Sequence, residues 1–216
     1  GSARRASEER VPQVLILAYH FPPIATVGSH RPAAYARYLP KSGWEPVVLT
    51  RTGDSRYPVD DSLLRGIGSD VLVDRITEPH LRYVFGAFTK LGLSRVMRSI
   101  ERWISLPDDQ YGWIAAAYAR GRTLIERVRP DAILCSCVPL SSAVAAALLR
   151  RATGVPLVLD FHNEWTRNMY FDPPTALHAR LQSRLESWVV DRSDAVVTLN
   201  PLHTEDYSRR LPEVPV

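Results

Sequence analysis

Cysteine, lysine and long apolar runs are all scarce in this chain of 216 residues. Its two cysteines, Cys135 and Cys137, stand one residue apart inside an apolar stretch. That spacing offers no disulfide framework, so a reducing cytoplasm is the expected compartment. Apolar runs such as Ala143–Leu149 reach seven residues, whereas a membrane-spanning helix needs about 18. The sequence therefore predicts neither a disulfide-rich secreted domain nor a transmembrane span.

Lysine occurs only at positions 41 and 90, and arginine supplies the other 25 of the 27 basic residues. Arginine codons are GC-rich, so a GC-rich genome accounts for this bias. An affinity for phosphates, which guanidinium groups bind bidentately, is the functional alternative. With 23 acidic residues the formal net charge is only +4, and no block of five like charges occurs. Nucleic acid is therefore not expected as a partner.

Hydrophobic residues make up 45% of the chain, which is enough to build a core and excludes global disorder. Gly1 and Ser2 resemble the remnant of an expression tag, and residues 1–10 as a whole are expected to be a disordered terminus. No repeat or linker divides the remainder. Residues 11–216 are therefore predicted to form one domain.

Short apolar runs alternate with longer amphipathic segments along residues 11–216. Strands are expected near residues 14–18, 45–50, 71–73, 131–137, 155–161 and 195–199. Helices are expected near residues 30–41, 81–104, 112–128, 141–151 and 177–189, with a short one after residue 200. Ser29 and Ser141 or Ser142 are the expected N-caps, and Gly43 and Gly154 the expected stops. The pattern predicts an α/β fold: a Rossmann-like, doubly wound, mainly parallel sheet of about six strands with helices on both faces.

Ligands of open parallel sheets bind beyond the carboxyl ends of the strands, so the loops at that edge are the candidate site. The first loop, residues 19–29, contains His20, Val27 and Gly28. A glycine just before a helix lets a ligand approach free backbone N–H groups. Only one glycine is present, so the loop is not the G-x-G-x-x-G dinucleotide fingerprint. A plain turn before a helix is the alternative.

The second loop, residues 135–141, carries Ser136 between the two cysteines. A Cys-x-Cys pair can bind a metal, but no further cysteine and no histidine cluster completes a tetrahedral site. No metal is therefore expected, and the cysteines are interpreted as small buried residues.

The third loop, residues 160–165, is the richest in chemistry. Asp160, His162, Asn163 and Trp165 follow one another closely at the end of a predicted strand. An imidazole can serve as a general base or donate to developing charge. The alternative is a histidine that only faces solvent or bonds the backbone. A serine hydrolase is not indicated, because the G-x-S-x-G elbow is absent.

The predicted helix at residues 81–104 combines an apolar face with basic residues. These are Arg82, Lys90, Arg95, Arg98 and Arg102. Such a helix can lie on an anionic membrane surface. A core-facing helix with a solvated polar side is the alternative. Peripheral contact with the inner face of the membrane through residues 81–104 is therefore one hypothesis.

Several segments share a recognisable order and spacing. They are residues 19–23 (Tyr-His-Phe-Pro-Pro), 28–31 (Gly-Ser-His-Arg), 39–41 (Leu-Pro-Lys), 43–50 (Gly-Trp-Glu-Pro-Val-Val-Leu-Thr), 107–109 (Pro-Asp-Asp), 130–133 (Pro-Asp-Ala-Ile) and 160–161 (Asp-Phe) with Trp165. Together they resemble the N-terminal domain of GT-B-fold glycosyltransferases of the group 1 type, also called family 4. The match covers about residues 12–211.

This resemblance implies one half of a GT-B fold, in a retaining enzyme that moves a sugar from a nucleotide-sugar to a glycan, lipid-linked or small-molecule acceptor. The nucleotide-sugar would be a co-substrate, and no further cofactor is implied. Val27 and Gly28 match the loop that approaches the donor diphosphate, and His162 matches the active-site histidine. The implied acceptor or sugar contacts are His20, Ser136, Asp160, Asn163 and Trp165.

The chain departs from the family pattern in two places. The subgroup that begins Tyr-His-Phe-Pro-Pro usually reads Asp-Phe-Arg-Asp-x-Trp in the third loop, whereas this chain has His162 and Asn163 there. The C-terminal, donor-binding domain of the family would follow residue 216, so residues 11–216 are interpreted as the acceptor-side domain, inactive by itself. A non-catalytic Rossmann-like module that binds a nucleotide or a protein is the competing hypothesis, and a peripheral membrane adaptor is a third.

Overall fold

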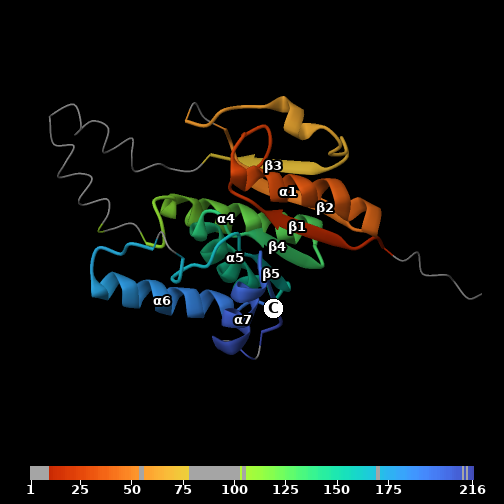
Figure 1. The fold of residues 1–216 in the computed structure, drawn as a ribbon. Helices are drawn as coiled ribbons and strands as arrows, with labels where there is room; N and C mark the ends of the chain where they lie inside the picture. Colours follow the sequence, from red (N-terminus) through yellow and green to blue (C-terminus); the bar gives the residue numbers. More distant parts are fainter. Residues whose placement is uncertain are drawn as a thin grey trace, which may run out of the picture.

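The computed structural model describes residues 10–53, 56–77, 103, 106–168, 171–210, 212 and 214–216. Across these residues, the strands form one sheet in which every neighbouring pair is parallel. They are β1 (Gln13–Leu17), β2 (Glu45–Arg51), β3 (Leu72–Ile76), β4 (Ala132–Ser136), β5 (Leu157–Asp160) and β6 (Ala195–Val197). Their spatial order, β3-β2-β1-β4-β5-β6 (Figure 1), is that of a doubly wound Rossmann-like sheet.

Helices connect the parallel strands, as parallel pairing requires. Within the described residues, the α-helices are α1 (Val27–Tyr38), α4 (Tyr111–Val128), α5 (Leu140–Thr153), α6 (Ala176–Val190) and α7 (Pro201–Arg210). Two short 3₁₀ helices, η1 (Leu39–Ser42) and η2 (Asp61–Leu64), lie on either side of β2 in the chain. Three crossovers run through α1, α5 and α6, which lead from β1 to β2, from β4 to β5 and from β5 to β6.

Both faces of the sheet are covered, because successive residues of a strand point to opposite faces. Leu15 belongs to a buried cluster with Trp113 of α4 and Leu149 of α5. Its neighbour Ile16 belongs to a second cluster with Ala36 of α1. Helix α1 thus lies on the opposite side of the sheet from α4 and α5 (Figure 1). The predicted fold class is confirmed.

Helix α1 begins earlier than the sequence predicts. Its first residue is Val27 and its N-cap is Thr26, so the prediction of Ser29 as the cap is wrong. Ser29 lies in the first turn, where it is fully buried and its hydroxyl oxygen is 3.1 Å from that of Thr26. The predicted stop is confirmed, since Gly43 ends η1 with a left-handed φ of 79°.

Helix α5 also begins without the expected cap. Its first residue is Leu140 after Pro139, and neither expected serine caps it through its side chain. Instead, the N–H and the hydroxyl of Ser141 both donate to the carboxylate of Asp108. The local sequence pattern misses this cap because the acceptor comes from a segment that precedes α4. At the other end, Gly154 closes the helix as predicted.

Strand β3 runs on to Ile76, although the apolar pattern predicts only residues 71–73. Asp74 and Arg75 extend the ladder with β2 despite their charge. An edge strand leaves one side and much of one face to solvent, so charged residues are compatible with it. Asp74 also accepts a hydrogen bond from Arg120 of α4 at 3.0 Å.

Two predictions fall largely outside the described residues. Of the predicted helix at 81–104 only Trp103 is described, and of the predicted terminus at 1–10 only Arg10. Within the part of the chain that the structure does describe, no helix is both long and apolar enough to cross a membrane.

Candidate functional site

Ser136, Asp160 and His162 form a buried polar cluster at the carboxyl edge of the sheet. Ser136 ends β4 and Asp160 ends β5, and the two are register partners. Register partners direct their side chains to the same face, which here is the face that α1 covers. The chain reverses its direction of winding between β1 and β4, and ligands of such sheets bind at that switch point.

Asp160 is a fully buried carboxylate. Arg31 of α1 binds both of its oxygens, with Nε 2.9 Å from Oδ2 and Nη2 2.5 Å from Oδ1. Tyr35, one turn later on α1, donates its hydroxyl to Oδ2 at 3.1 Å. A buried carboxylate without such partners is strongly destabilising. The pairing with α1 therefore permits an aspartate at this buried strand end.

The two donors on α1 keep their protons. Burial acts to lower the pKa of Arg31, but the hydrogen bond that Arg31 donates to the hydroxyl of Tyr35 and the charge of Asp160 outweigh it, and the pKa rises above its ordinary value. Burial, followed by the charge of Asp160, raises the pKa of Tyr35. Arg31 is therefore a cation and Tyr35 a neutral donor throughout the physiological pH range.

His162 lies beside this carboxylate and is 8% exposed. Its Nε2 is 3.2 Å from Oγ of Ser136, which is a hydrogen bond. The same nitrogen is 3.7 Å from Oδ2 of Asp160, which is an electrostatic contact beyond hydrogen-bond length. The structure thus brings together three of the residues that the sequence singles out.

His20 packs against Gly28 at the start of α1. A methyl group added at Gly28 would meet Cδ2 of His20 at 3.0 Å, so glycine leaves room for this ring. The ring also meets Tyr19 and Tyr57 edge-on, with centroids 4.9 and 5.1 Å apart. Burial, and then the positive charge of Arg51, lower the pKa of His20 to about 4. His20 is therefore a neutral ring beside the helix start at neutral pH.

The start of α1 has features that suit an anion. Val27 is 85% exposed, whereas Gly28 is buried. The N-cap Thr26 makes no capping hydrogen bond with its side chain. The N–H groups of a first helical turn have no partner within the helix and carry the positive end of its dipole. This local geometry is compatible with the predicted role of Val27 and Gly28 beside a phosphate.

A protein carboxylate occupies the neighbouring helix start, that of α5. Asp108 accepts from N and Oγ of Ser141 at 2.9 and 2.6 Å, and from N of Gln110 at 3.0 Å. Desolvation raises the pKa of Asp108 in spite of these hydrogen bonds. Gln110 in turn accepts from the hydroxyl of Tyr19 at 2.5 Å. Of these two helix starts, that of α5 accepts a protein carboxylate, whereas at that of α1 the N–H of Ser29 donates to the carbonyl of Thr26 at 3.0 Å.

Asn163 and Trp165, two other predicted contacts, differ from the cluster in exposure and in partners. Asn163 follows His162 and is exposed. Trp165 is 1% exposed, and its Nε1 donates to Oε1 of Gln182 on α6 at 2.8 Å. The indole thus fixes the third loop against α6 and is covered on its faces by the core. Thr166 adds a second tie to α6 through its 2.5 Å hydrogen bond to Glu186.

Arg31 and Tyr35 are the site residues that sequence reasoning missed. A signal exists, since positions 28, 31 and 35 are three and four apart and so share one face of a helix. A buried aspartate at a strand end also requires a counter-charge. Which arginine supplies it depends on how α1 packs on the sheet, and the sequence pattern does not give that.

Metal ligation receives no support from the described residues. Among them, no group of three or more histidine, cysteine, aspartate or glutamate side chains could hold a metal ion. Cys135 and Cys137 are both buried free thiols.

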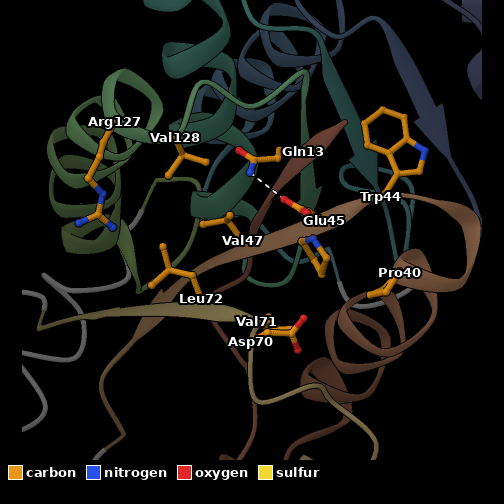
Figure 2. A pocket seen from close by; sticks show the side chains of 11 residues that line it. Gln13, Pro40, Trp44, Glu45, Val47, Asp70, Val71, Leu72, Arg127 and Val128 are labelled. Atoms are coloured by element: carbon orange, nitrogen blue, oxygen red, sulfur yellow. Dashed lines mark hydrogen bonds between the residues drawn. The ribbon is translucent and has the colours of Figure 1, made fainter. Parts of the chain in front are cut away.

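A cavity of about 450 Å³ lies at the opposite edge, where β1, β2 and β3 begin (Figure 2). Its lining includes Trp44, Leu72 and Arg127. Gln13 donates to Glu45 at 2.9 Å on its wall. The polar cluster and this cavity lie at opposite edges of the sheet, so they suggest two different positions for a ligand site. We assign the site to the carboxyl edge, because ligands of open parallel sheets bind there and the buried charges gather there.

Comparison with protein families decides the affiliation. The model of the glycosyl transferase 4-like domain matches residues 28–215. The chain belongs to this family. The predicted resemblance to the N-terminal domain of a GT-B glycosyltransferase is thereby confirmed, and the match includes all of the cluster around His162.

Solved structures share the fold of this glycosyl transferase 4-like domain. Sucrose-phosphate synthase from Thermosynechococcus elongatus is 13% identical, with a TM-score of 0.54 over 93% of this chain and 45% of that one. Phytolacca americana UGT2 is 14% identical, with a TM-score of 0.53 over 95% and 52%. Glycyrrhiza uralensis UGT73P12 is 12% identical, with a TM-score of 0.52 over 95% and 48%. At such identities the likeness shows the fold alone. The chain spans about half the length of these proteins, and no curated protein sequence matches it.

Proposed function

We propose that this domain is the acceptor-binding half of a retaining glycosyltransferase of the hexosyltransferase type. The enzyme would move a sugar from a nucleotide-sugar to a glycan, lipid-linked or small-molecule acceptor, as in polysaccharide biosynthesis. A C-terminal domain would bind the donor, and no metal or other cofactor would take part. We also propose that the enzyme is cytoplasmic and that residues 81–104 make peripheral contact with the membrane.

The observation that carries this proposal is the position of His162. Its imidazole lies at the carboxyl edge, bonded to Ser136 and next to the Asp160–Arg31 ion pair. Arg31 belongs to the same helix whose first turn contains Gly28. A ligand bound between the start of α1 and the third loop would therefore contact both a helix N-terminus and an imidazole.

The ligands of a structural neighbour support the choice of substrates. Phytolacca americana UGT2 is complexed with UDP-2fluoro-glucose and pterostilbene. A nucleotide-sugar and a glycan, lipid-linked or small-molecule acceptor are accordingly the substrate classes that we propose for the whole enzyme.

Substitution of His162 by alanine in the full-length protein tests the proposal. We expect kcat for sugar transfer to fall by about 10²-fold or more, because the imidazole would act in the transition state. The measurement is transfer from a panel of nucleotide-sugars, with thermal unfolding of each variant as the control for folding. The domain by itself is expected to transfer no sugar.

Two outcomes would contradict this. Unchanged kinetics in the His162→Ala variant would leave His162 without a catalytic role. Measurable binding of a nucleotide or protein, together with no transfer by any full-length form, would favour the non-catalytic binding module instead.

A further inference from the structure

The environment of His162 differs for its two ring nitrogens. We propose that Ser136 and Asp160 hold His162 in the tautomer with its proton on Nε2, and that Arg31 and Tyr35 are positioning residues that orient Asp160 for this purpose. Nδ1 then carries the lone pair and is the nitrogen that accepts a hydrogen bond from a bound hydroxyl group.

Ser136 alone does not choose between the tautomers. Its hydroxyl lies 3.2 Å from Nε2 of His162 and can either donate to an unprotonated Nε2 or accept from a protonated one. Both arrangements satisfy this hydrogen bond equally well.

Asp160 favours the tautomer of His162 with its proton on Nε2. Its Oδ2 lies 3.7 Å from the same Nε2, so a proton on Nε2 places a positive hydrogen toward a buried negative oxygen. A lone pair on Nε2 would instead face that charge, which is unfavourable at low local dielectric. Asp160 is fully buried, so little water screens the interaction. With the proton on Nε2, the hydroxyl of Ser136 becomes the acceptor.

Arg31 and Tyr35 fix which carboxylate oxygen faces the ring. Arg31 reaches Oδ1 with Nη2 and Oδ2 with Nε, and Tyr35 donates to Oδ2 from the same helix. These three hydrogen bonds from one rigid element leave Asp160 a single orientation. The guanidinium also balances the carboxylate charge, so the pair polarises the imidazole without leaving a net buried charge beside it.

The consequence concerns Nδ1. Among the residues that the structure describes, no group donates to or accepts from Nδ1 of His162, whereas Nε2 is engaged. In the proposed tautomer Nδ1 is an acceptor, and the ligand group that fits it is a hydroxyl, as polyhydroxylated sugars and acceptors carry. This assignment of the ligand class rests on the proposed transferase function, but the tautomer itself does not.

Long-range ¹H–¹⁵N NMR correlation on protein labelled with ¹⁵N-histidine tests the tautomer directly. At mildly alkaline pH and without any substrate, we expect the His162 Nδ1 resonance in the range of an unprotonated nitrogen and Nε2 in that of a protonated one. A protonated Nδ1 in the native protein would overturn the proposal.

Removing the carboxylate tests the cause. In the Asp160→Asn variant we expect the tautomer with the proton on Nδ1 to become populated, because the charge that selects Nε2–H is gone. If this variant fails to fold, the Arg31→Gln, Asp160→Asn double variant removes both charges together and leaves no unpaired ion; the same change of tautomer is expected. A native-like His162 spectrum in the variant that folds would overturn the role of Asp160.

A matched control lies at the other end of the sheet. Asp194 directly precedes β6 and accepts from N of Leu157, the first residue of β5. It also accepts from Nε and Nη2 of Arg150 at 2.8 and 3.1 Å, a carboxylate–guanidinium pairing of the same chemistry. Asp194→Asn should leave the His162 spectrum unchanged. A shift there as well would mean that any lost ion pair perturbs His162, and the specific role of Asp160 would be refuted.

Kinetics of the full-length enzyme separate this inference from the proposed function. If transfer is observed, Asp160→Asn should lower kcat by about 10²-fold with a smaller effect on KM, whereas Asp194→Asn should not. If no transfer is observed, the proposed function fails while the NMR result still decides the tautomer.

Discussion

At the carboxyl edge, the residue type at several positions is explained by the side chain that packs against it. Gly28 faces the ring of His20, whose Cδ2 would lie 3.0 Å from an added methyl group. Arg31 supplies the positive charge that pairs with the fully buried carboxylate of Asp160. The sequence predicts that His20, Gly28, Asp160 and His162 belong to one site. It does not predict that α1 supplies the cation, because only packing brings Arg31 to the end of β5.

His20 gives the domain a pH dependence of known sign. Its pKa is about 4 in the folded state and about 6.5 in an unfolded chain, so the unfolded state binds more protons between these values. The contribution of neutral His20 to the free energy of unfolding, about 2–3 kcal/mol, is fully present above pH ~6.5 and is lost as the pH falls toward 4. Chemical denaturation across this window should show the loss, and His20→Gln should reduce it. His30→Gln, the same substitution at an exposed position, controls for the effect of replacing a histidine by glutamine.

The helix starts also depend on residues that are distant in the sequence. Ser141 has the residue type of an N-cap, yet α5 is capped by Asp108 from outside the helix. The helices can be predicted from the sequence because the spacing of their apolar residues is a local pattern. Caps and strand ends are less predictable, since a distant side chain can satisfy the same backbone groups. The extension of β3 over Asp74 and Arg75 has a similar origin in pairing with β2.

Removal of the Asp108 carboxylate should destabilise the start of α5. Asp108→Ala leaves the N–H of Ser141 and that of Gln110 without their acceptor, and we expect a loss of about 1–3 kcal/mol in the free energy of unfolding. Asp108→Asn should cost less, because an amide oxygen still accepts. Urea denaturation measures both variants. Asp60, an exposed residue that accepts from the N–H of Ser62 at 2.8 Å, is the matched comparison, and an equal loss in Asp60→Ala would refute the importance of burial.

At the scale of the whole molecule, the sheet has two unlike edges. The carboxyl edge gathers the buried charges and the start of α1, whereas the amino edge has the cavity of about 450 Å³ near Trp44 and Arg127 (Figure 2). The cavity therefore favours a ligand site at the amino edge, whereas the buried polar cluster favours one at the carboxyl edge. The switch point of the winding lies between β1 and β4, and for this reason we assign the candidate site to the carboxyl edge.

Substitutions at the amino edge test this assignment. Glu45→Gln and Arg127→Gln change exposed side chains on the cavity wall. We expect kcat/KM for sugar transfer by the full-length protein to stay within about twofold of the native value, because surface changes away from a site have small effects. A large loss of activity in either variant, with the fold retained, would move the candidate site to the cavity.

The sequence by itself determined the fold class and most elements of this domain, because apolar periodicity and the glycines at 43 and 154 act over a few residues. It also indicated the loops of the site, since strand ends in a parallel sheet share one edge. Only the tertiary structure decided the partners: Arg31 for Asp160, Asp108 for α5, Gln182 for Trp165. Buried polar groups must find partners wherever the packed chain supplies them, and those partners lie 17 to 129 residues away in sequence.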